Sequence, residues 1–304
     1  MANKEILGNL FREALYSANS VPEIMETFSD KISTNFGAED FLLLQMASQL
    51  KESAQIRKTA HEYMRMMSIV SSQCFKLINE KHPELHFCTS QRFKSFLSEL
   101  YKRYERISDG LSPEIKDLPA LRIILLEPET QEILRMEYIV VQEILENFSI
   151  LNIDEKFPLY VNLSVADKSI TKNTFNPEEY PEVLIPNPDI IIPKLSNLGK
   201  DYISNPKKSG YQSFHLTFEL VQKNDPSIRV FAEIQIRTIT QHKYAEAGPA
   251  SHKNYKNRRN KKYEEIFEFD KNKVHINGYY PDFDLKDFSG FSRPIFVTER
   301  SKTF

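Results

Sequence analysis

Two stretches decide the fold: SFHLTFEL (Ser213 to Leu220) and IRVFAEIQIR (Ile228 to Arg237). In each, apolar side chains alternate with polar ones, which is the pattern of a half-buried strand. The link between them, QKNDPS, is short and polar, so an antiparallel hairpin is predicted. If both apolar sets are buried on one side, the opposite face carries four polar side chains: His215, Glu233, Gln235 and Arg237. This face is a candidate site.

The neighbouring segments predict more strands and helices. LRIILL (Leu121 to Leu126) is typical of a buried strand, and Glu129 to Phe148 of an amphipathic helix that follows it. PLYVNLSVA is a further strand candidate, and a helix is expected from Thr238 to Lys256. Weak strand signals occur at 273–276 and 294–298. The proline-rich insert at about 168–200 predicts irregular structure.

The N-terminal third is expected to be helical. From residue 3 to residue 106 only one proline follows Pro22, and apolar residues recur at three-to-four spacing. A methionine-rich stripe from Phe41 to Val70 suits one long helix or a broken pair, and is interpreted as core. The next helix is predicted to open near Thr89 or Ser90 and to continue through QRFKSFLSELYKRYERI.

Composition excludes several classes of protein. The 304 residues carry 40 Lys and Arg against 42 Asp and Glu, so a globally basic nucleic-acid coat is excluded, although a local basic patch is not. Only eight glycines occur and they are widely spaced, so glycine-rich phosphate loops are absent. Two cysteines without a CxxC pair support neither a zinc site nor a disulfide framework. With no apolar span or signal core, the expectation is a soluble cytoplasmic protein.

The acids Asp117 and Glu233 are the candidate catalytic pair. Asp117 precedes the LRIILL strand, where a carboxylate at a strand mouth can bind a hard cation. Two carboxylates together with phosphate oxygens form a usual ligand set for Mg²⁺. A solvated Asp and a salt-bridged Glu remain the alternative on spacing alone.

Two further segments combine cations with other polar groups. Arg92, Lys94 and Lys102 lie at offsets 0, 2 and 10 on the expected helix, with Ser95 between them. A solvated basic helix is the simple alternative. In NPKKSGY (Asn205 to Tyr211), the glycine allows a tight turn, the lysines can meet phosphates and the tyrosine offers a stacking plane.

These segments, in this order, resemble the RelA/SpoT synthetase domain. The resemblance is carried by RFKSFLSELYK, DLPALR, DYISNPKKSGYQSFH, AEIQIRT and HKYAEAGPASHKNYK, which together span Arg92 to Lys256. It implies an α+β fold with a nucleotidyltransferase-like mixed β-sheet flanked by helices, preceded by a helical N-terminal region. The domains expected are a helical region at 1–86, a synthetase domain at 87–262 and an aromatic C-terminal extension at 263–304.

The resemblance implies transfer of the β,γ-pyrophosphate of ATP to the 3′-hydroxyl of GDP or GTP, giving (p)ppGpp, the product of the stringent response. Asp117 and Glu233 would hold Mg²⁺, and Glu233 would help to deprotonate the attacking hydroxyl. Residues matched to ATP binding are Arg92, Lys94, Ser95, Lys102 and Arg122. Residues matched to the acceptor are Lys207, Lys208, Tyr211, His215, Gln235 and Arg237.

Two departures from the family pattern leave alternatives open. Ala120 stands where the family often has Gly, and Ser209 where it often has Asn, in the loop that meets the acceptor base. With the basic stretch from Lys253 to Lys262, this keeps a toxin that pyrophosphorylates the 3′ end of tRNA as the alternative function. A catalytically inactive nucleotide- or partner-binding module is the third. An antitoxin or regulatory protein partner and a homo-oligomer stay open, and no membrane is expected.

Overall fold

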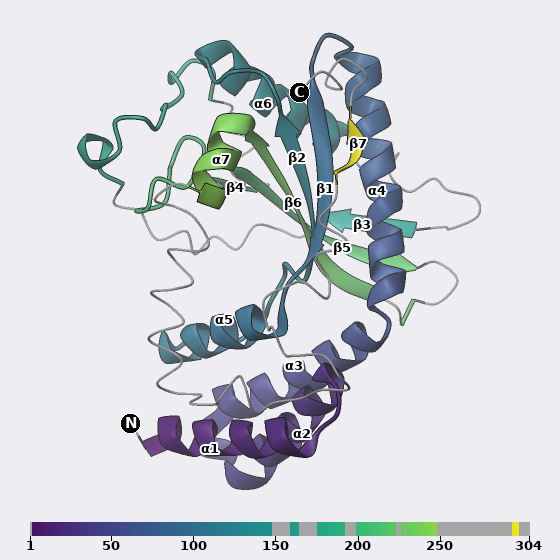
Figure 1. Ribbon diagram of the computed structural model, residues 1–304, viewed down its shortest axis with the longest axis vertical. Helices are drawn as coiled ribbons and strands as arrows, with labels where there is room; N and C mark the ends of the chain where they lie inside the picture. The colour runs from purple at the N-terminus through teal and green to yellow at the C-terminus, as the bar shows by residue number, and fades with distance from the viewer. Residues whose placement is uncertain are drawn as a thin grey trace. The chain divides into compact units, whose positions relative to one another are not determined.

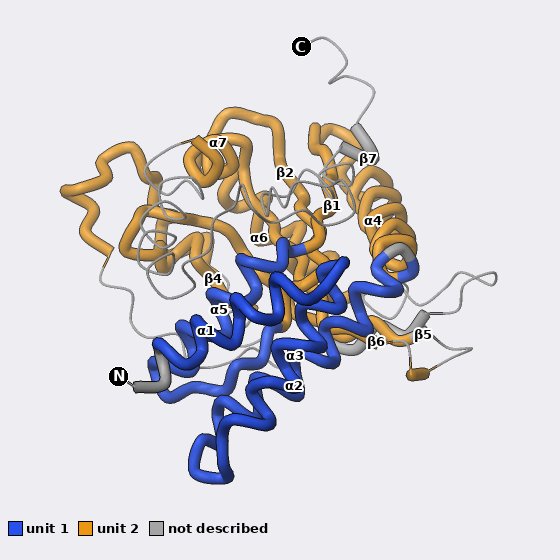
Figure 2. The backbone as a smooth tube through the Cα atoms, turned by 60° about the horizontal axis from the view of Figure 1, so that its bottom comes forward, with its two compact units in different colours: residues 1–62, 94–115, 256–290 blue, residues 63–93, 116–255, 291–304 orange. Residues whose placement is uncertain are grey.

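The computed structural model describes residues 2–147, 159–163, 175–191, 199–222, 226–227, 229–247 and 294–297. These residues divide between two compact units (Figure 2). The first contains 2–62 and 94–115 and is helical. The second contains residues 63–93 and the described residues from 116 onward, and it holds the β-sheet. The described part of the chain is therefore α+β, as predicted. The predicted division at residues 86 and 262 stays a prediction.

The sheet of the second unit has the strand order β3-β5-β6-β2-β1-β7, with β4 paired to β5 (Figure 1). Its central pair, β2 and β6, is parallel, and the other described pairs are antiparallel, so the sheet is mixed. The strands are β1 (Phe87–Phe93), β2 (Pro119–Leu125), β3 (Leu159–Leu163), β4 (Lys200–Asp201), β5 (Phe214–Gln222), β6 (Arg229–Thr238) and β7 (Pro294–Val297).

One face of this sheet is covered by α4 (Ala60–Lys81) and α6 (Gln131–Glu146). Phe75 of α4 packs on Phe87 of β1, with ring centroids 4.9 Å apart, and Tyr138 of α6 meets Phe214 of β5 edge-on at 6.4 Å. The buried apolar residues of β5 and β6 alternate with the polar ones, as the pattern predicted. The other face of these strands is therefore left for polar side chains.

The predicted hairpin is confirmed as β5 and β6. The LRIILL strand is confirmed as β2, and the helix after it as α6. The strand candidates at 158–166 and 294–298 are confirmed in part as β3 and β7, and α7 (Ile239–Ala247) is the described part of the helix expected from Thr238. The short 3₁₀ helix η3 (Pro177–Glu179) lies in the insert. The strand signal at 273–276, the basic stretch at 257–262 and most of the C-terminal extension lie outside the described residues.

Of the two N-terminal helix predictions, one needs correction and the other is confirmed as a broken pair. The helix expected from Thr89 or Ser90 is wrong for its first residues, because these belong to β1; the helix α5 is Phe96–Ser108 and is capped by Ser95. The stripe from Phe41 to Val70 lies on a broken pair, α3 (Phe41–Lys58) and α4, with the break at Thr59. Most of the stripe is buried as predicted, but Phe41 is 66% exposed.

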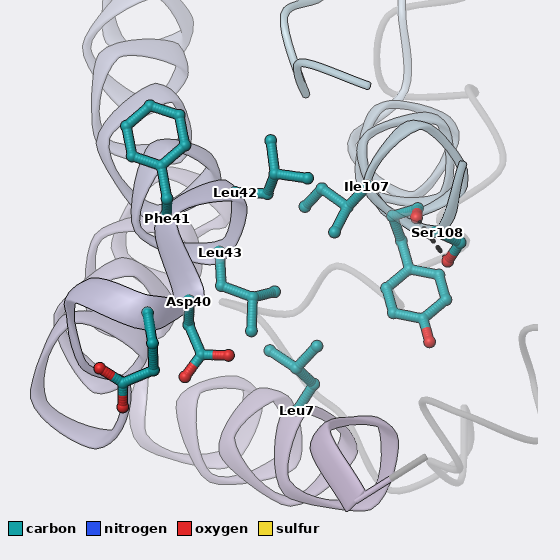
Figure 3. Close-up of a pocket in the computed structure, with 9 residues that line it drawn as sticks. Leu7, Asp40, Phe41, Leu42, Leu43, Ile107 and Ser108 are labelled. Atoms are coloured by element: carbon teal, nitrogen blue, oxygen red, sulfur yellow. Dashed lines mark hydrogen bonds between the residues drawn. The ribbon is translucent and has the colours of Figure 1, made fainter. Parts of the chain in front are cut away.

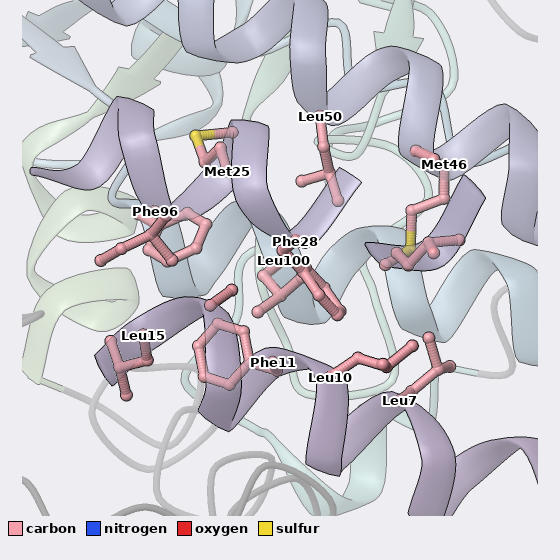
Figure 4. Packing of buried hydrophobic residues seen from close by; sticks show 14 of the residues in the cluster. Leu7, Leu10, Phe11, Leu15, Met25, Phe28, Met46, Leu50, Phe96 and Leu100 are labelled. Atoms are coloured by element: carbon pink, nitrogen blue, oxygen red, sulfur yellow. The ribbon is translucent and has the colours of Figure 1, made fainter. Parts of the chain in front are cut away.

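The helical unit is built from α1 (Ala2–Ser17), α2 (Val21–Asn35), η1 (Ala38–Asp40), α3 and α5. Its core brings together aromatic and aliphatic side chains of these helices, including Phe11, Phe28 and Phe96 (Figure 4). Phe11 and Phe28 meet edge-on, with centroids 5.4 Å apart. This unit also holds an open pocket between α1, α3 and α5, lined by apolar Leu7, Leu43 and Ile107 and by the acid Asp40 (Figure 3). None of the predicted site residues lines it.

Candidate functional site

The polar face of the sheet is organised by the register of three adjacent strands. Arg122 of β2 lies opposite Gln235 of β6, and Gln235 lies opposite His215 of β5. In the next row Glu233 lies between Ala120 and Thr217. Because side chains alternate along a strand, Arg122, His215, Glu233 and Gln235 share one face, together with Arg237. The register therefore collects predicted residues of three kinds, for ATP, for the acceptor and for catalysis.

A chain of hydrogen bonds fixes Glu233 within this face. The Tyr211 hydroxyl lies 2.9 Å from Nε2 of His215, and Nδ1 of His215 lies 3.0 Å from Oε2 of Glu233. The other carboxylate oxygen of Glu233 accepts a 2.6 Å bond from Nε2 of Gln235. Both Glu233 and His215 are only 7% exposed. Buried groups held this closely can act only in one orientation, which suits a positioned base.

The His215–Glu233 contact is ionic. Burial alone would raise the pKa of Glu233, but the charge of His215 and its hydrogen bond outweigh burial and lower it. Burial would lower the pKa of His215, but the charge of Glu233 overrides it, with a smaller contribution from Tyr211, and raises it. The two shifts are in the directions expected of an ion pair, in which each charge stabilises the other.

Asp117 lies just before β2 and is 8% exposed. It is close enough for its negative charge to raise the pKa of Glu233. Two carboxylates that repel each other at the mouth of a strand fit a divalent cation, whose charge would relieve that repulsion. No cluster of three or more metal-ligating side chains occurs among the residues that the structure describes. Two carboxylates could hold Mg²⁺ in a shell completed by water and phosphate oxygens.

Three arginines gather beside the acids: Arg92 of β1, Arg122 of β2 and Arg237 of β6. Burial lowers the pKa of Arg122 to about 9, with the positive charges of Arg92 and Arg237 acting in the same direction. Glu246 of α7 is their carboxylate partner, and its Oε1 lies 3.1 Å from Nη1 of Arg122 and 3.4 Å from Nη2 of Arg237. The arrangement can bind anions.

The predicted turn before β5 is present. Gly210 has φ of 77°, its N–H donates a 2.7 Å bond to the carbonyl of Lys207, and the N–H of Lys207 donates to the carbonyl of Tyr211 at 3.1 Å. Nζ of Lys207 lies over the rings of Tyr202 and Tyr211, 4.5 and 4.9 Å from their centroids. Lys208 is exposed. One of the two lysines thus lies against the aromatic plane predicted to stack on a base.

The remaining predicted ATP residues belong to the helical unit. Ser95 caps α5, accepting a bond from the Ser98 N–H at 3.4 Å, and Lys102 lies on that helix. The backbone carbonyl of Lys94 accepts a 2.9 Å bond from Nη2 of Arg57. Arg92 is in β1, so the three cations do not share a helix as the sequence analysis expected.

Two contacts of the site were not predicted. Glu246 belongs to the quoted segment HKYAEAGPASHKNYK, and Tyr202 to DYISNPKKSGYQSFH, but neither was given a role. The sequence does hold a signal for Glu246: this acid lies one helix turn beyond His242 and shortly after Arg237, near the end of β6. Its partner on β2 is 124 positions away in numbering, and no local pattern shows that pairing.

The sequence matches a family model described as the region found in RelA / SpoT proteins, over residues 190–260. Two curated plant proteins align over 57 residues: GTP diphosphokinase CRSH1, chloroplastic, of Oryza sativa subsp. japonica at 44% identity, and probable GTP diphosphokinase CRSH, chloroplastic, of Arabidopsis thaliana at 46%. Each alignment covers 19% of this chain and 9% of the relative, so the chain spans less than a tenth of those proteins.

Two solved structures are similar to larger parts of the chain. Small alarmone synthetase 2 of Bacillus subtilis is 22% identical, with 70% of this chain and 89% of that chain covered and a TM-score of 0.36. A GTP pyrophosphokinase family protein of Streptococcus pneumoniae is 19% identical, with 69% and 80% covered and a TM-score of 0.32.

The family match covers the turn, the hairpin and α7, which carry Tyr211, His215, Glu233, Arg237 and Glu246. Among the described residues, no helix has the length and apolar character needed to cross a bilayer. Residues 190–260 are thus similar to the region found in RelA and SpoT proteins.

Proposed function

We propose that this protein is an ATP-dependent pyrophosphokinase that transfers the β,γ-pyrophosphate of ATP to the 3′-hydroxyl of GDP or GTP. The observation that carries the proposal is Glu233, an ionised and buried carboxylate held by His215 and Gln235 beside Asp117. It lies in the segment that matches the RelA/SpoT region. The curated plant relatives, named GTP diphosphokinases, support the same reaction class.

The charges of the site suit transfer of a phosphoryl group. Such a reaction needs positioning and neutralisation of charge more than a protein nucleophile. Arg122 and Arg237 supply fixed positive charge on the face that also holds Glu233, and Arg92 lies within electrostatic range of Arg122. Lys94, Ser95 and Lys102 are proposed as further ATP contacts on sequence grounds.

Asp117 and Glu233 would hold Mg²⁺, which supplies Lewis-acid neutralisation of the phosphate oxygens when it is bound. Glu233 would also accept the proton of the attacking hydroxyl. His215 keeps that carboxylate ionised and fixes its orientation. Tyr211, whose hydroxyl is anchored on His215, would present its ring to the acceptor base, and Lys207 and Lys208 would contact acceptor phosphates.

Product analysis tests the proposal. ATP labelled in the γ position is incubated with GDP, with GTP and with tRNA in parallel, and the products are separated by thin-layer chromatography. The proposal expects labelled guanosine 3′-diphosphates. Label in tRNA alone would favour the tRNA-modifying toxin, and ATP binding without transfer to any acceptor would favour the inactive module.

Glu233→Gln and Asp117→Asn keep the shapes of the side chains and remove their charges. We expect each to lower transfer by about 10²- to 10⁴-fold, the usual contribution of a positioned general base or acid. Glu132→Gln is the control, since that acid on α6 is 69% exposed and pairs weakly with Arg135 at 4.0 Å. Full activity of the Glu233→Gln protein would refute the assigned chemistry.

A further inference from the structure

Glu246 occupies the space between two buried arginines that carry more positive charge than it can neutralise. Its single oxygen Oε1 is shared between Nη1 of Arg122 and Nη2 of Arg237, at 3.1 and 3.4 Å. Strong charge-assisted bonds are shorter, about 2.7 to 2.9 Å, and a guanidinium prefers two parallel bonds to one carboxylate. Glu246 is therefore an incomplete partner for both arginines.

The arginines have donors left over. Nε of Arg237 and Nε of Arg92 are buried and find no hydrogen-bond acceptor in the described part of the chain. Nε of Arg122 reaches only Oε1 of Gln235, at 3.4 Å. Buried donors without acceptors are costly and usually mark a place where a ligand or water completes the network.

The other titratable groups near this cluster do not balance it. Burial, with the charges of Arg237 and Arg122, lowers the pKa of His242 to about 4, so that imidazole is neutral at pH 7. Glu137 lies within electrostatic range of Arg237, but burial raises its pKa well above 4.5. Glu233 is paired with His215, at 3.0 Å. Glu246 is a carboxylate on which the charges of all three arginines act.

Exposure shows which partner can leave. The side chain of Glu246 is 40% exposed, whereas those of Arg122 and Arg237 are 13% and 1% exposed. Its carboxylate can turn to water at small cost, since an ion in water needs no protein partner, while the arginines are fixed in the sheet.

We propose that Glu246 is an internal competitor for substrate phosphate: it pairs with Arg122 and Arg237 when no ligand is bound and is displaced when a polyphosphate binds between them. The proposal rests on the proposed function for the identity of the ligand, a nucleotide polyphosphate. A phosphate offers more negative charge and more acceptor oxygens than one carboxylate, and can satisfy donors that Glu246 leaves unpaired. Glu246 is thus a residue that sets affinity and is not catalytic.

The opposite reading is that Glu246 is a permanent brace, without which the arginines would lose their positions. The two readings predict opposite signs. Removing a competitor strengthens binding of an anion, and removing a brace weakens it.

The test measures binding of inorganic pyrophosphate to the full chain by isothermal titration calorimetry, without nucleotide or turnover. Glu246→Gln keeps the shape and removes the charge, so we expect the Kd to fall by about 2- to 5-fold, as for the loss of one partly exposed ion pair. Glu246→Asp shortens the side chain and should lie between wild type and Glu246→Gln. Glu132→Gln, on the same unit, should bind like wild type.

An unchanged or higher Kd for Glu246→Gln, or no pyrophosphate binding by any of these proteins, would overturn the proposal. If Glu246→Gln fails to fold, the direction of the change in Glu246→Asp decides in the same way. Because the probe is inorganic, this result is independent of whether the protein transfers pyrophosphate to GDP, GTP or tRNA. In an active enzyme, Glu246→Gln should also lower the KM for nucleotide without raising kcat.

Discussion

Glu99 of α5 lies between two arginines in the helical unit, with no exposed surface. Its Oε2 accepts a 2.6 Å bond from Nη2 of Arg57, and its Oε1 accepts bonds of 3.0 and 2.7 Å from Nε and Nη2 of Arg103. Burial opposes ionisation, but the charges of Arg103 and Arg57 outweigh it and lower the pKa of Glu99 from 4.5 to about 2. The carboxylate is stabilised in the folded state.

This difference in pKa corresponds to roughly 3 kcal/mol of stability at neutral pH. Glu99→Gln would also leave the two guanidinium groups, each only 3% exposed, without a counter-charge. Breaking a buried ion pair by removing one partner costs about 3 to 5 kcal/mol. We therefore expect Glu99→Gln to lower the free energy of unfolding of the helical unit by about 3 to 5 kcal/mol.

Urea unfolding followed by far-ultraviolet circular dichroism measures this change, since the chain has no tryptophan for fluorescence. Asp30→Asn is the matched control in the same unit. Asp30 is 67% exposed and 3.3 Å from Lys51, so its loss should cost less than about 1 kcal/mol. A loss for Glu99→Gln no larger than that of Asp30→Asn would refute the reasoning.

The pH dependence gives a second criterion. Because the folded pKa of Glu99 is depressed, its contribution is complete above about pH 5 and is lost as the pH falls toward 2. The difference in stability between wild type and Glu99→Gln should therefore shrink on acidification; a constant difference would contradict the ionic assignment. Arg57 also donates to the Lys94 carbonyl, so the same variant should disturb a proposed ATP contact.

Three further predictions concern the sheet unit. Burial raises the pKa of Glu137 well above 4.5, so the folded protein keeps this proton to a higher pH than the unfolded chain does. The wild-type urea midpoint should therefore fall as the pH rises above about 4.5, and Glu137→Gln should lessen that fall. Gly210→Ala places a Cβ 2.9 Å from the Tyr244 hydroxyl at φ of 77°. Its control, Gly110→Ala, has φ of 71° and open space around the Cβ, and should lower the free energy of unfolding by roughly 1 kcal/mol. Urea unfolding should show a larger loss for Gly210→Ala. NMR titration should place the pKa of His215 above 6.5, and Glu233→Gln should lower this pKa. The stabilising contribution of His215 should be lost as the pH rises through the raised pKa of the folded state. A wild-type pKa at or below 6.5 would contradict the ion pair.

The sequence predicts the hairpin because its signal is local. The apolar residues from Phe214 to Leu220 and from Val230 to Ile236 are buried as the alternation predicts, so the polar face could be assigned without coordinates. The prediction of half-buried strands is wrong for this stretch, because the polar residues His215, Glu233, Gln235 and Arg237 are buried too. The strand β1 does show alternating burial, but Thr89 and Gln91 occupy two of its inward positions. These polar groups meet Ser71 and Ser68 of α4, and this pairing hides the strand from a pattern of hydrophobic residues.

The site could be predicted only in part. The pairing of Asp117 with Glu233 rests on the place of Asp117 just before an expected strand, on the place of Glu233 on the polar face of another and on the family resemblance, and the electrostatic effect of Asp117 on Glu233 agrees with it. The arginine cluster depends on the parallel pairing of β2 with β6, strands more than a hundred residues apart, which a local pattern does not encode. The contact of Glu246 with Arg122 and Arg237 follows from that pairing.

The amide of Gln235 is held in one orientation between two charged side chains of the polar face. Its Nε2 donates a hydrogen bond to Glu233, and its Oε1 accepts one from Nε of Arg122. One end of the amide therefore contacts an anion and the other a cation. An acid at this position would repel Glu233, and a lysine would repel Arg122; glutamine satisfies both neighbours at once. Gln235 thereby connects Arg122 to the carboxylate of Glu233, which lies two residues along the same strand.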